Sequence, residues 1–244
     1  MSTLIKIKNN FEKLKLNTMY ERLEYHLNSL TVENDKLLNI LLDLTDFEIA
    51  FKDKRAELIN IHISNFPYSK TIDDFDFSFQ PSINKNQIMD LLTLRFLDNF
   101  DNILFYGLSG TGKTHLSVAI GMVAASKRIS TYFITCHDLI QNLKKALSEN
   151  RLAEKIKVYN KYKLLIIDEI GFLPIKKEDA SLLFQLISKR YETKSTIITT
   201  NISFSKWGEL FGDNAIASAI LDRLVHHSHI IQIDGPSYRM KDML

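Results

Sequence analysis

The sequence predicts an α/β fold, with a five-stranded parallel sheet flanked by helices and a small all-α domain before it. Three observations lead to this prediction. Short apolar runs of strand length alternate with helical segments, which favours a parallel sheet covered on both faces. A glycine-rich loop joins the first run to a helix, and no glycine or proline occurs between Ser2 and His62. The predicted strands are Asn102–Tyr106, Thr131–Thr135, Leu164–Asp168, Thr196–Thr200 and Ile230–Ile233.

The N-terminal segment repeats apolar residues at helical spacing, and we expect two to four helices there. Thr31 is the expected N-cap of one of them, with Asn34 three residues later as an imperfect capping box. Pro67 interrupts the helical pattern. We therefore place an accessory helical domain at residues 1–66.

A connector is expected at residues 67–84, followed by the main domain at residues 85–244. Asn84–Phe96 is predicted to be a helix that leads to the first strand. The connector contains an aromatic run with two interpretations, a docked linker or part of an adenine pocket. The run consists of Phe75, Phe77 and Phe79.

The loop Gly107–Thr114 fits the phosphate-binding pattern G-x-x-x-x-G-K-[ST] at every fixed position. It follows the first predicted strand and precedes an apolar helix over His115–Ala125. Strand, loop and helix in this order direct backbone N–H groups and a helix N-terminus at phosphate. Lys113 is expected to reach the β- and γ-phosphates, and Thr114 to hold Mg²⁺. The alternative is a glycine-rich turn without a chemical role.

The continuous apolar run Leu164–Ile167 is typical of a parallel strand that is buried on both faces. It ends in Asp168 and Glu169, at the edge of the sheet where ligands bind in open α/β folds. Asp168 is expected to serve the metal ion, and Glu169 to polarise a water for attack on the γ-phosphate. Otherwise the two carboxylates only end the strand and face solvent.

Composition excludes few function classes. The 244 residues carry a net charge of +2, and Cys136 is the single cysteine, so the sequence contains no internal disulfide. No stretch is long and apolar enough to span a bilayer, and we expect a cytoplasmic protein. Basic residues gather between Lys127 and Lys163, where nine of them face three acidic residues, a local charge of +6.

With both motifs placed, the chain from Phe66 onward resembles the IstB-type transposition helper ATPases of bacterial insertion sequences. These belong to the AAA+ superfamily of P-loop NTPases, near the DnaC helicase loaders and DnaA initiators. The N-terminal helices resemble the accessory domain of the same family, with less distinctive motifs. The matching stretches are Asp74–Phe77, Gly107–Thr114, Tyr132–Leu139, Leu165–Pro174, Phe184–Ile187, Ile197–Asn201, Trp207–Gly208, Ile220–His227 and Ser237–Arg239.

The resemblance implies roles for three further residues. Asn201 ends the predicted strand Thr196–Thr200, which is expected beside the strand of Asp168. It matches the residue that senses the γ-phosphate and orients water, although an Asn at a strand end is also a common turn former. Arg223 matches the arginine that reaches a neighbouring subunit's nucleotide; a structural salt bridge is the alternative. Arg239 matches an arginine that contacts nucleotide in the same subunit, or it is an exposed tail residue. The expected nucleotide ligands are Gly107, Ser109, Gly110, Thr111, Gly112, Lys113, Thr114, His115, Asp168 and Arg239.

The basic segment falls where the related initiators carry DNA-contacting helices, and it includes a helix predicted over Asp138–Ser148. Contact with DNA phosphates is the favoured interpretation, and a solvated charged face is the alternative. The candidate DNA-binding residues are Lys127, Arg128, Lys144, Lys145, Lys155 and Lys157.

The resemblance thus implies an ATP- and Mg²⁺-dependent ATPase that oligomerises on double-stranded DNA and delivers it to an IstA-type transposase. A DnaC-like replicative helicase loader is the alternative, with single-stranded DNA and a helicase as partners. A third interpretation is an ATP-bound scaffold that does not hydrolyse. Glu169, Asn201 and Arg223 together argue against a scaffold, which would not need all three.

Overall fold

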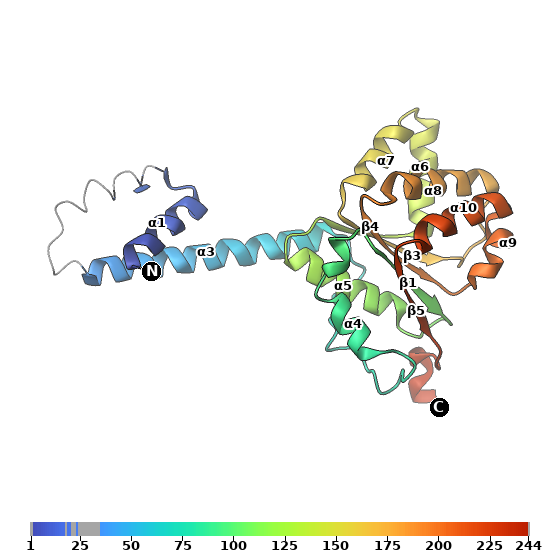
Figure 1. Cartoon of the computed structure of the whole chain (residues 1–244), viewed down its shortest axis with the longest axis horizontal. Helices are drawn as coiled ribbons and strands as arrows, with labels where there is room; N and C mark the ends of the chain where they lie inside the picture. The colour runs from blue at the N-terminus through green and yellow to red at the C-terminus, as the bar shows by residue number, and fades with distance from the viewer. Residues whose placement is uncertain (1, 18, 21–22, 24–34, 244) are drawn as a thin grey trace. The chain divides into compact units, whose positions relative to one another are not determined.

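The computed structural model describes the chain except residues 1, 18, 21–22, 24–34 and 244 (Figure 1). It divides into two compact units, Met1–Ile59 and Asn60–Leu244. The expected N-cap Thr31 and its partner Asn34 lie outside the described residues. Within the described ranges, no helix is both long and apolar enough to cross a membrane.

The first unit contains helix α1, Thr3–Leu14, and most of helix α3, Asp35–Ile63. α1 buries an apolar face that includes Ile7 and Phe11. From the same helix, Asn10 Nδ2 donates a hydrogen bond to Thr45 Oγ1 of α3 over 3.1 Å. A buried polar side chain needs such a partner, and this bond fixes where the two helices meet.

The second unit is built on a parallel sheet with the strand order β2-β3-β4-β1-β5, which confirms the predicted five-stranded sheet. β4 lies between β3 and β1, so the phosphate-loop strand and the strand with the two carboxylates are separated by one neighbour. The strands are β1 Asn102–Gly107, β2 Thr131–Thr135, β3 Leu164–Ile170, β4 Ser195–Thr200 and β5 Ser228–Ile233.

Helices cover both faces of this sheet (Figure 1). Alternate residues of β3 enter two separate cores: Leu164 and Ile166 on one side, Leu165 and Ile167 on the other. This alternation explains the continuous apolar run, because a strand buried on both faces has no polar side. The longer helices are α4 Lys85–Leu91, α5 Lys113–Ser126, α6 Cys136–Ser148, α7 Leu152–Lys161, α8 Lys177–Arg190 and α10 Asn214–Val225.

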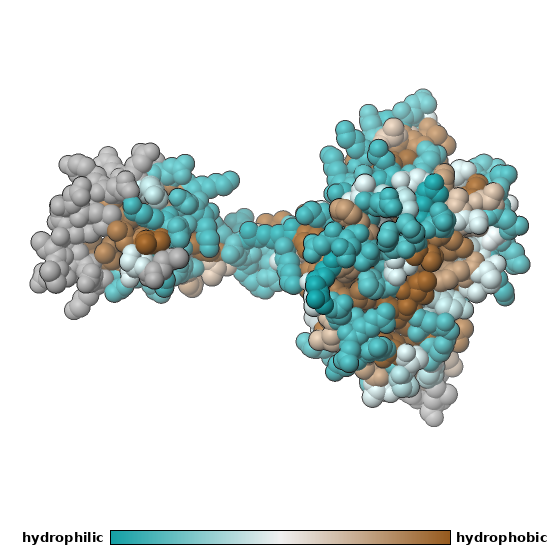
Figure 2. All heavy atoms as spheres, in the orientation of Figure 1, coloured by the Kyte–Doolittle hydropathy of each residue, from teal (hydrophilic) through white to brown (hydrophobic). Residues whose placement is uncertain are grey.

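Short elements complete the unit: α9 Trp207–Phe211 and the 3₁₀ turns η2 Arg95–Leu97, η3 Phe204–Lys206 and η4 Tyr238–Met243. β5 is an edge strand, and Figure 2 shows brown, apolar side chains over it. Ile230 of this strand is 44% exposed.

The helix predicted over Asn84–Phe96 is correct only in its first half. Asn84 caps α4 through its side chain, which accepts hydrogen bonds from the backbone N–H groups of Asn86 and Gln87. The helix then stops, because Leu94 has a left-handed backbone with φ of 70°, a conformation that no helical residue adopts. A separate 3₁₀ turn, η2, leads on towards β1.

Candidate nucleotide-binding site

The phosphate loop lies between β1 and α5, as the motif predicts. Gly110 and Gly112 have φ of 80° and 97°, in the left-handed region that favours glycine. Space is short as well: a Cβ on Gly110 would lie 2.0 Å from Ser237 Oγ, and one on Gly112 would lie 2.5 Å from the Phe75 ring. The C-terminal segment and the connector therefore pack directly against the loop.

A cavity of about 430 Å³ opens beside this loop. Its walls come from four parts of the chain: the connector, the loop with the start of α5, the carboxyl ends of β3 and β4, and the C-terminal segment. The lining residues are Tyr68, Lys70, Asp74, Phe75, Asp76, Gln80, Ser109, Gly110, Thr111, Gly112, Lys113, Thr114, His115, Glu169, Phe172, Thr199, Thr200, Asn201, Tyr238 and Arg239.

Lys113 is held at the base of the loop. Its Nζ donates hydrogen bonds to the carbonyl oxygens of Gly107 and Leu108, over 2.7 and 2.6 Å. Partial burial lowers the pKa of the Lys113 ammonium, and nearby Asp168 opposes that shift. A partly desolvated cation attracts an anion more strongly than one in bulk water does, so this lysine is suited to bind phosphate.

Thr114 and Asp168 lie together as predicted. Thr114 Oγ1 donates to the Asp168 carboxylate, with distances of 3.0 and 3.1 Å to its two oxygens. Burial raises the pKa of the Asp168 carboxyl, and hydrogen bonds from Thr199 and Thr114 counteract part of that rise. A hydroxyl and a carboxylate oxygen side by side are hard ligands of the kind Mg²⁺ prefers, so these residues fit the ion.

The two carboxylates of β3 lie in a β-bulge that turns their side chains in different directions. Ile167 pairs with Ile198 of β4 and Ile170 with Thr200, so Asp168 and Glu169 together face the single residue Thr199. Glu169 takes a left-handed φ of 62° at this point. The extra residue lets Asp168 remain buried while Glu169 is exposed and lines the cavity.

Thr199 was not predicted as a site residue, although it connects both carboxylate positions. Its hydroxyl donates to Asp168 Oδ1 over 2.5 Å and accepts from the backbone N–H of Glu169 over 2.8 Å. It was missed because a threonine within an apolar run is usually explained by its preference for β-strands. One sequence signal could have identified Thr199: it is the penultimate residue of a predicted strand that was expected to lie beside β3.

Asn201 directly follows β4 and lines the cavity near Glu169. Because β4 is hydrogen-bonded to β3, the predicted adjacency of these two strands is confirmed. The structure therefore brings Glu169 and Asn201 to the same cavity as the phosphate loop.

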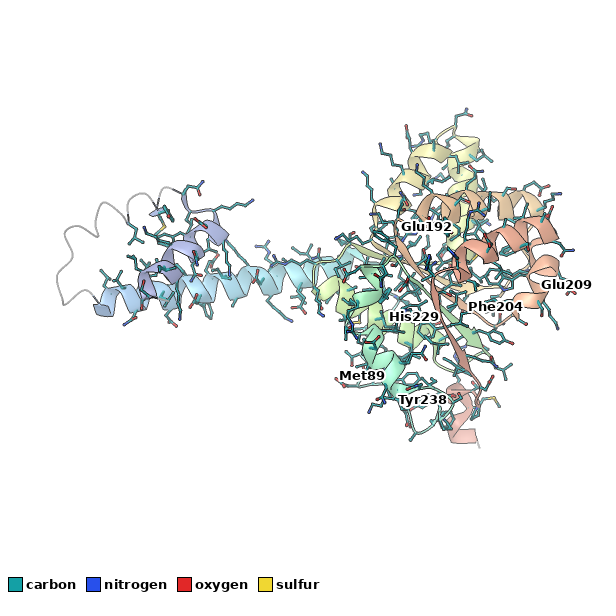
Figure 3. The ribbon with its side chains drawn as sticks, in the orientation of Figure 1. Met89, Glu192, Phe204, Glu209, His229 and Tyr238 are labelled. Atoms are coloured by element: carbon teal, nitrogen blue, oxygen red, sulfur yellow. The ribbon has the colours of Figure 1, made fainter. Side chains whose placement is uncertain are left out.

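Arg239 reaches the same cavity from the C-terminal segment, next to Tyr238, which Figure 3 labels. The backbone N–H of Tyr238 donates to the Gly110 carbonyl oxygen over 2.9 Å. Gln80 Nε2 of the connector donates to the Pro236 carbonyl oxygen over 2.8 Å. These bonds hold the C-terminal segment against both the loop and the connector.

The connector is docked on the core, as one of the two interpretations predicts, and it also lines the cavity. Phe75 and Phe77 pack against the core on the α5 side of the sheet, and Phe75 also lines the cavity. The Phe75 ring meets the ring of His115 edge-on, with centroids 5.2 Å apart. His115 Nε2 lies 2.7 Å from the Thr71 carbonyl oxygen, so the connector is fixed to the start of α5.

Arg223 does not line the cavity. Gly107 and Asp168 are not among the lining residues either, but they are bonded to Lys113 and Thr114, which line it. Arg223 lies on α10, where its Nη1 donates to the Ala219 carbonyl oxygen over 2.9 Å. Its guanidinium carbon is 4.8 Å from the centroid of the Phe184 ring. In the described part of the chain no ion pair involves Arg223, which does not favour the salt-bridge alternative.

The candidate DNA-binding residues fall into separate places. Lys144 on α6 forms an ion pair with Asp179 of α8 over 3.2 Å, and Lys155 on α7 lies over the ring of Tyr159. Lys145 and Lys157 are exposed on the same two helices. Lys127 and Arg128 instead follow α5, and Lys127 lines a different cavity.

Comparison with known proteins agrees with this geometry. The IstB-like ATP binding protein family matches residues 9–244. The insertion sequence IS232 putative ATP-binding protein of Bacillus thuringiensis subsp. berliner is 51% identical over 243 residues, covering 97% of each chain.

Solved structures resemble a large part of this chain. The DnaC helicase loader is 28% identical with a TM-score of 0.50, covering 70% of this chain and 97% of that one. AMPPCP-bound DnaA from Aquifex aeolicus is 21% identical with a TM-score of 0.56, covering 73% and 55%. The α/β P-loop fold of the AAA+ type is thus shared with these proteins. Taken with the match along nearly the whole sequence, this shows that the chain belongs to the IstB-like ATP-binding protein family.

Proposed function

We propose that this protein is an ATP-hydrolysing transposition helper that oligomerises on duplex DNA and activates a transposase of the IstA type. The observation that carries the hydrolytic part is the β3 bulge. It keeps Asp168 buried against Thr114, which lines the cavity, while Glu169 is exposed in that cavity. A protein that only bound ATP would not need a second, exposed carboxylate there.

The predicted site residues have distinct tasks in this proposal. Lys113 and the loop N–H groups bind the phosphates of ATP, and Arg239 contacts them from the C-terminal segment. Thr114 and Asp168 would hold Mg²⁺, which neutralises phosphate charge when bound. Glu169 accepts a proton from the attacking water, and Asn201 orients that water.

Arg223 acts in trans in this scheme. Because it does not line the cavity of its own chain, it is available to contact the nucleotide of a neighbouring copy. An arginine at that place stabilises the negative charge of the transition state. Hydrolysis would then depend on assembly, and assembly on bound ATP.

Duplex DNA is the proposed platform for this assembly, through phosphate contacts of basic residues on α6 and α7. Such contacts give salt-dependent binding with little sequence preference. The role in transposition is supported by the relative at 51% identity, which is an insertion sequence protein.

A replicative helicase loader remains the second candidate, because the DnaC helicase loader is 28% identical over 70% of this chain. The insertion sequence relative matches at higher identity and over 97% of the chain, including the first unit. That difference favours the transposition helper.

The test is electron microscopy together with a phosphate-release assay, using ATP, Mg²⁺ and duplex or single-stranded DNA of equal length. We expect ordered assemblies on duplex DNA only with ATP, and duplex-stimulated release of phosphate. Assembly on single strands alone would favour the loader. Absence of DNA-stimulated turnover would remove both ATPase proposals.

A further inference from the structure

A second cavity, of about 410 Å³, lies at the opposite edge of the sheet from the nucleotide cavity. Figure 3 labels Glu192, in the loop before β4, and Tyr238, beside the nucleotide cavity, at different ends of the strands. Three lysines, one acid and an apolar floor form the second cavity. Its lining residues are Thr93, Leu94, Leu97, Asp98, Phe100, Lys127, Ile129, Lys163 and Lys194.

Strand register places two of these lysines side by side. Lys163 directly precedes β3 and Lys194 directly precedes β4, and the first residues of these strands, Leu164 and Ser195, are paired. The backbone N–H of Ser195 donates to the Lys163 carbonyl oxygen over 3.2 Å. Lys127 joins them because α5 runs back along the sheet and has this residue as its C-cap.

This arrangement brings three positive charges together with few negative charges to balance them. Asp98 is the one acid among the lining residues, and the described part of the chain shows no ion pair for Lys127, Lys163 or Lys194. Like charges that are held close together repel each other. An anion in the cavity would relieve that repulsion.

The chemistry favours phosphate. Ammonium groups on flexible stems bind phosphate as point charges from several directions. The floor of Leu94, Leu97 and Ile129 excludes part of the water that would otherwise screen them. A further lysine, Lys161, lies close by: its carbonyl oxygen accepts a hydrogen bond from Ser130 Oγ over 3.5 Å, and Ser130 directly follows Ile129 of the cavity wall. A lone phosphate ion in the cavity would not use Lys161, whereas a chain of phosphates would also contact it.

We infer that this cavity binds a backbone phosphate of duplex DNA through Lys127, Lys163 and Lys194. The inference rests on the proposed function as a duplex-binding protein and adds a contact site at the edge remote from the nucleotide. DNA held there does not cover the nucleotide cavity, so both ligands bind the same chain at once.

The test compares the full-length parent with a Lys163→Ala/Lys194→Ala double variant. Binding to fluorescent duplex DNA is measured by anisotropy with a non-hydrolysable ATP analogue at several salt concentrations. We expect the variant to bind about ten-fold more weakly at 0.1 M salt, with a plot of log affinity against log salt that is shallower by about one to two. Lys189→Ala, which changes an exposed lysine of α8 that lines neither cavity, is the matched control and should behave as the parent.

Two further measurements separate the possible failures. ATP-analogue affinity and Tm of the double variant should equal or exceed those of the parent, because repulsion is removed. A variant that binds duplex like the parent, with the same salt slope, overturns this inference alone. A parent that binds no duplex overturns the proposed DNA binding as well.

A calorimetric titration with inorganic phosphate identifies the source of the phosphate group. Binding of phosphate that the double variant loses, while duplex affinity and salt slope stay unchanged, would make this a site for free phosphate and contradict the DNA assignment. Loss of duplex affinity together with weak or no binding of free phosphate supports it.

Discussion

Charged side chains are held in different ways at the carboxyl ends and at the amino ends of the parallel strands. At the carboxyl edge, Asp168 and Lys113 are bonded to hydroxyl and carbonyl groups that fix their position. At the amino edge, Lys163 and Lys194 line a cavity without an ion pair among the described residues. Fixed charge suits a reaction, which needs atoms placed within fractions of an ångström. Lysine side chains that can change position suit a polymer such as DNA, whose phosphates can bind at many positions along the chain.

The largest expected effect follows from removing a fixed lysine. In Lys113→Ala the phosphates lose a charge-assisted hydrogen bond and a partly desolvated cation, so ATP affinity should fall by about 100-fold or more, with no measurable hydrolysis. A fluorescent ATP analogue measures the affinity. The Lys163→Ala/Lys194→Ala variant is the comparison. Equal loss of ATP binding in both variants would contradict the claim that only the lysine at the carboxyl ends of the strands serves nucleotide binding.

Arg223→Ala should bind ATP like the parent and hydrolyse about 10³-fold more slowly, because the cation that stabilises the transition state is missing. Phosphate release measures the rate. Mixing this variant with Glu169→Gln should restore activity, since each supplies what the other lacks. No recovery at any mixing ratio would count against action in trans.

Glu169→Gln should keep ATP affinity and lose about 10²- to 10³-fold in hydrolysis, because an amide cannot accept the proton from water. Single-turnover phosphate release reports this step, and assemblies on duplex DNA should persist in electron micrographs. Turnover at the parental rate would show that another group is the base.

Thr199→Val tests the bulge with a smaller perturbation. The substitution removes the hydrogen bonds to Asp168 and to the Glu169 backbone, and we expect a ten- to hundred-fold slower hydrolysis at about unchanged ATP affinity. Thr200→Val is the matched control, since its hydroxyl bonds locally to Ile202. Equal losses in both variants would indicate general damage to β4.

The sequence predicted the elements that follow local rules and missed those that depend on long-range packing. The phosphate loop, the five strands and the pairing of Thr114 with Asp168 could be predicted, because spacing and apolar runs determine them. The end of α4 at Leu91 could not, since the left-handed backbone of Leu94 that follows it has no local sequence signal.

The list of predicted site residues was incomplete for the same reason. Gln80 and Tyr238 join the cavity through bonds between segments more than 100 positions apart, which no local pattern reveals. The bulge at Asp168 and Glu169 was hidden because a continuous apolar run does not show where pairing slips by one residue. Arg223 and Arg239 received roles through resemblance, and the structure places only Arg239 at the cavity.

The bulge also has a genetic consequence. Ile167 and Ile170 pair with Ile198 and Thr200, which are two residues apart on β4, and both isoleucines enter the same core. Glu169 is therefore the residue in excess of the regular register, and loss of its codon would leave Ile170 facing that core while removing the carboxylate from the cavity. A missense change at the same codon would remove the carboxylate without shortening the strand. Relatives that have abandoned hydrolysis should therefore carry either a one-residue deletion or a substitution at this position.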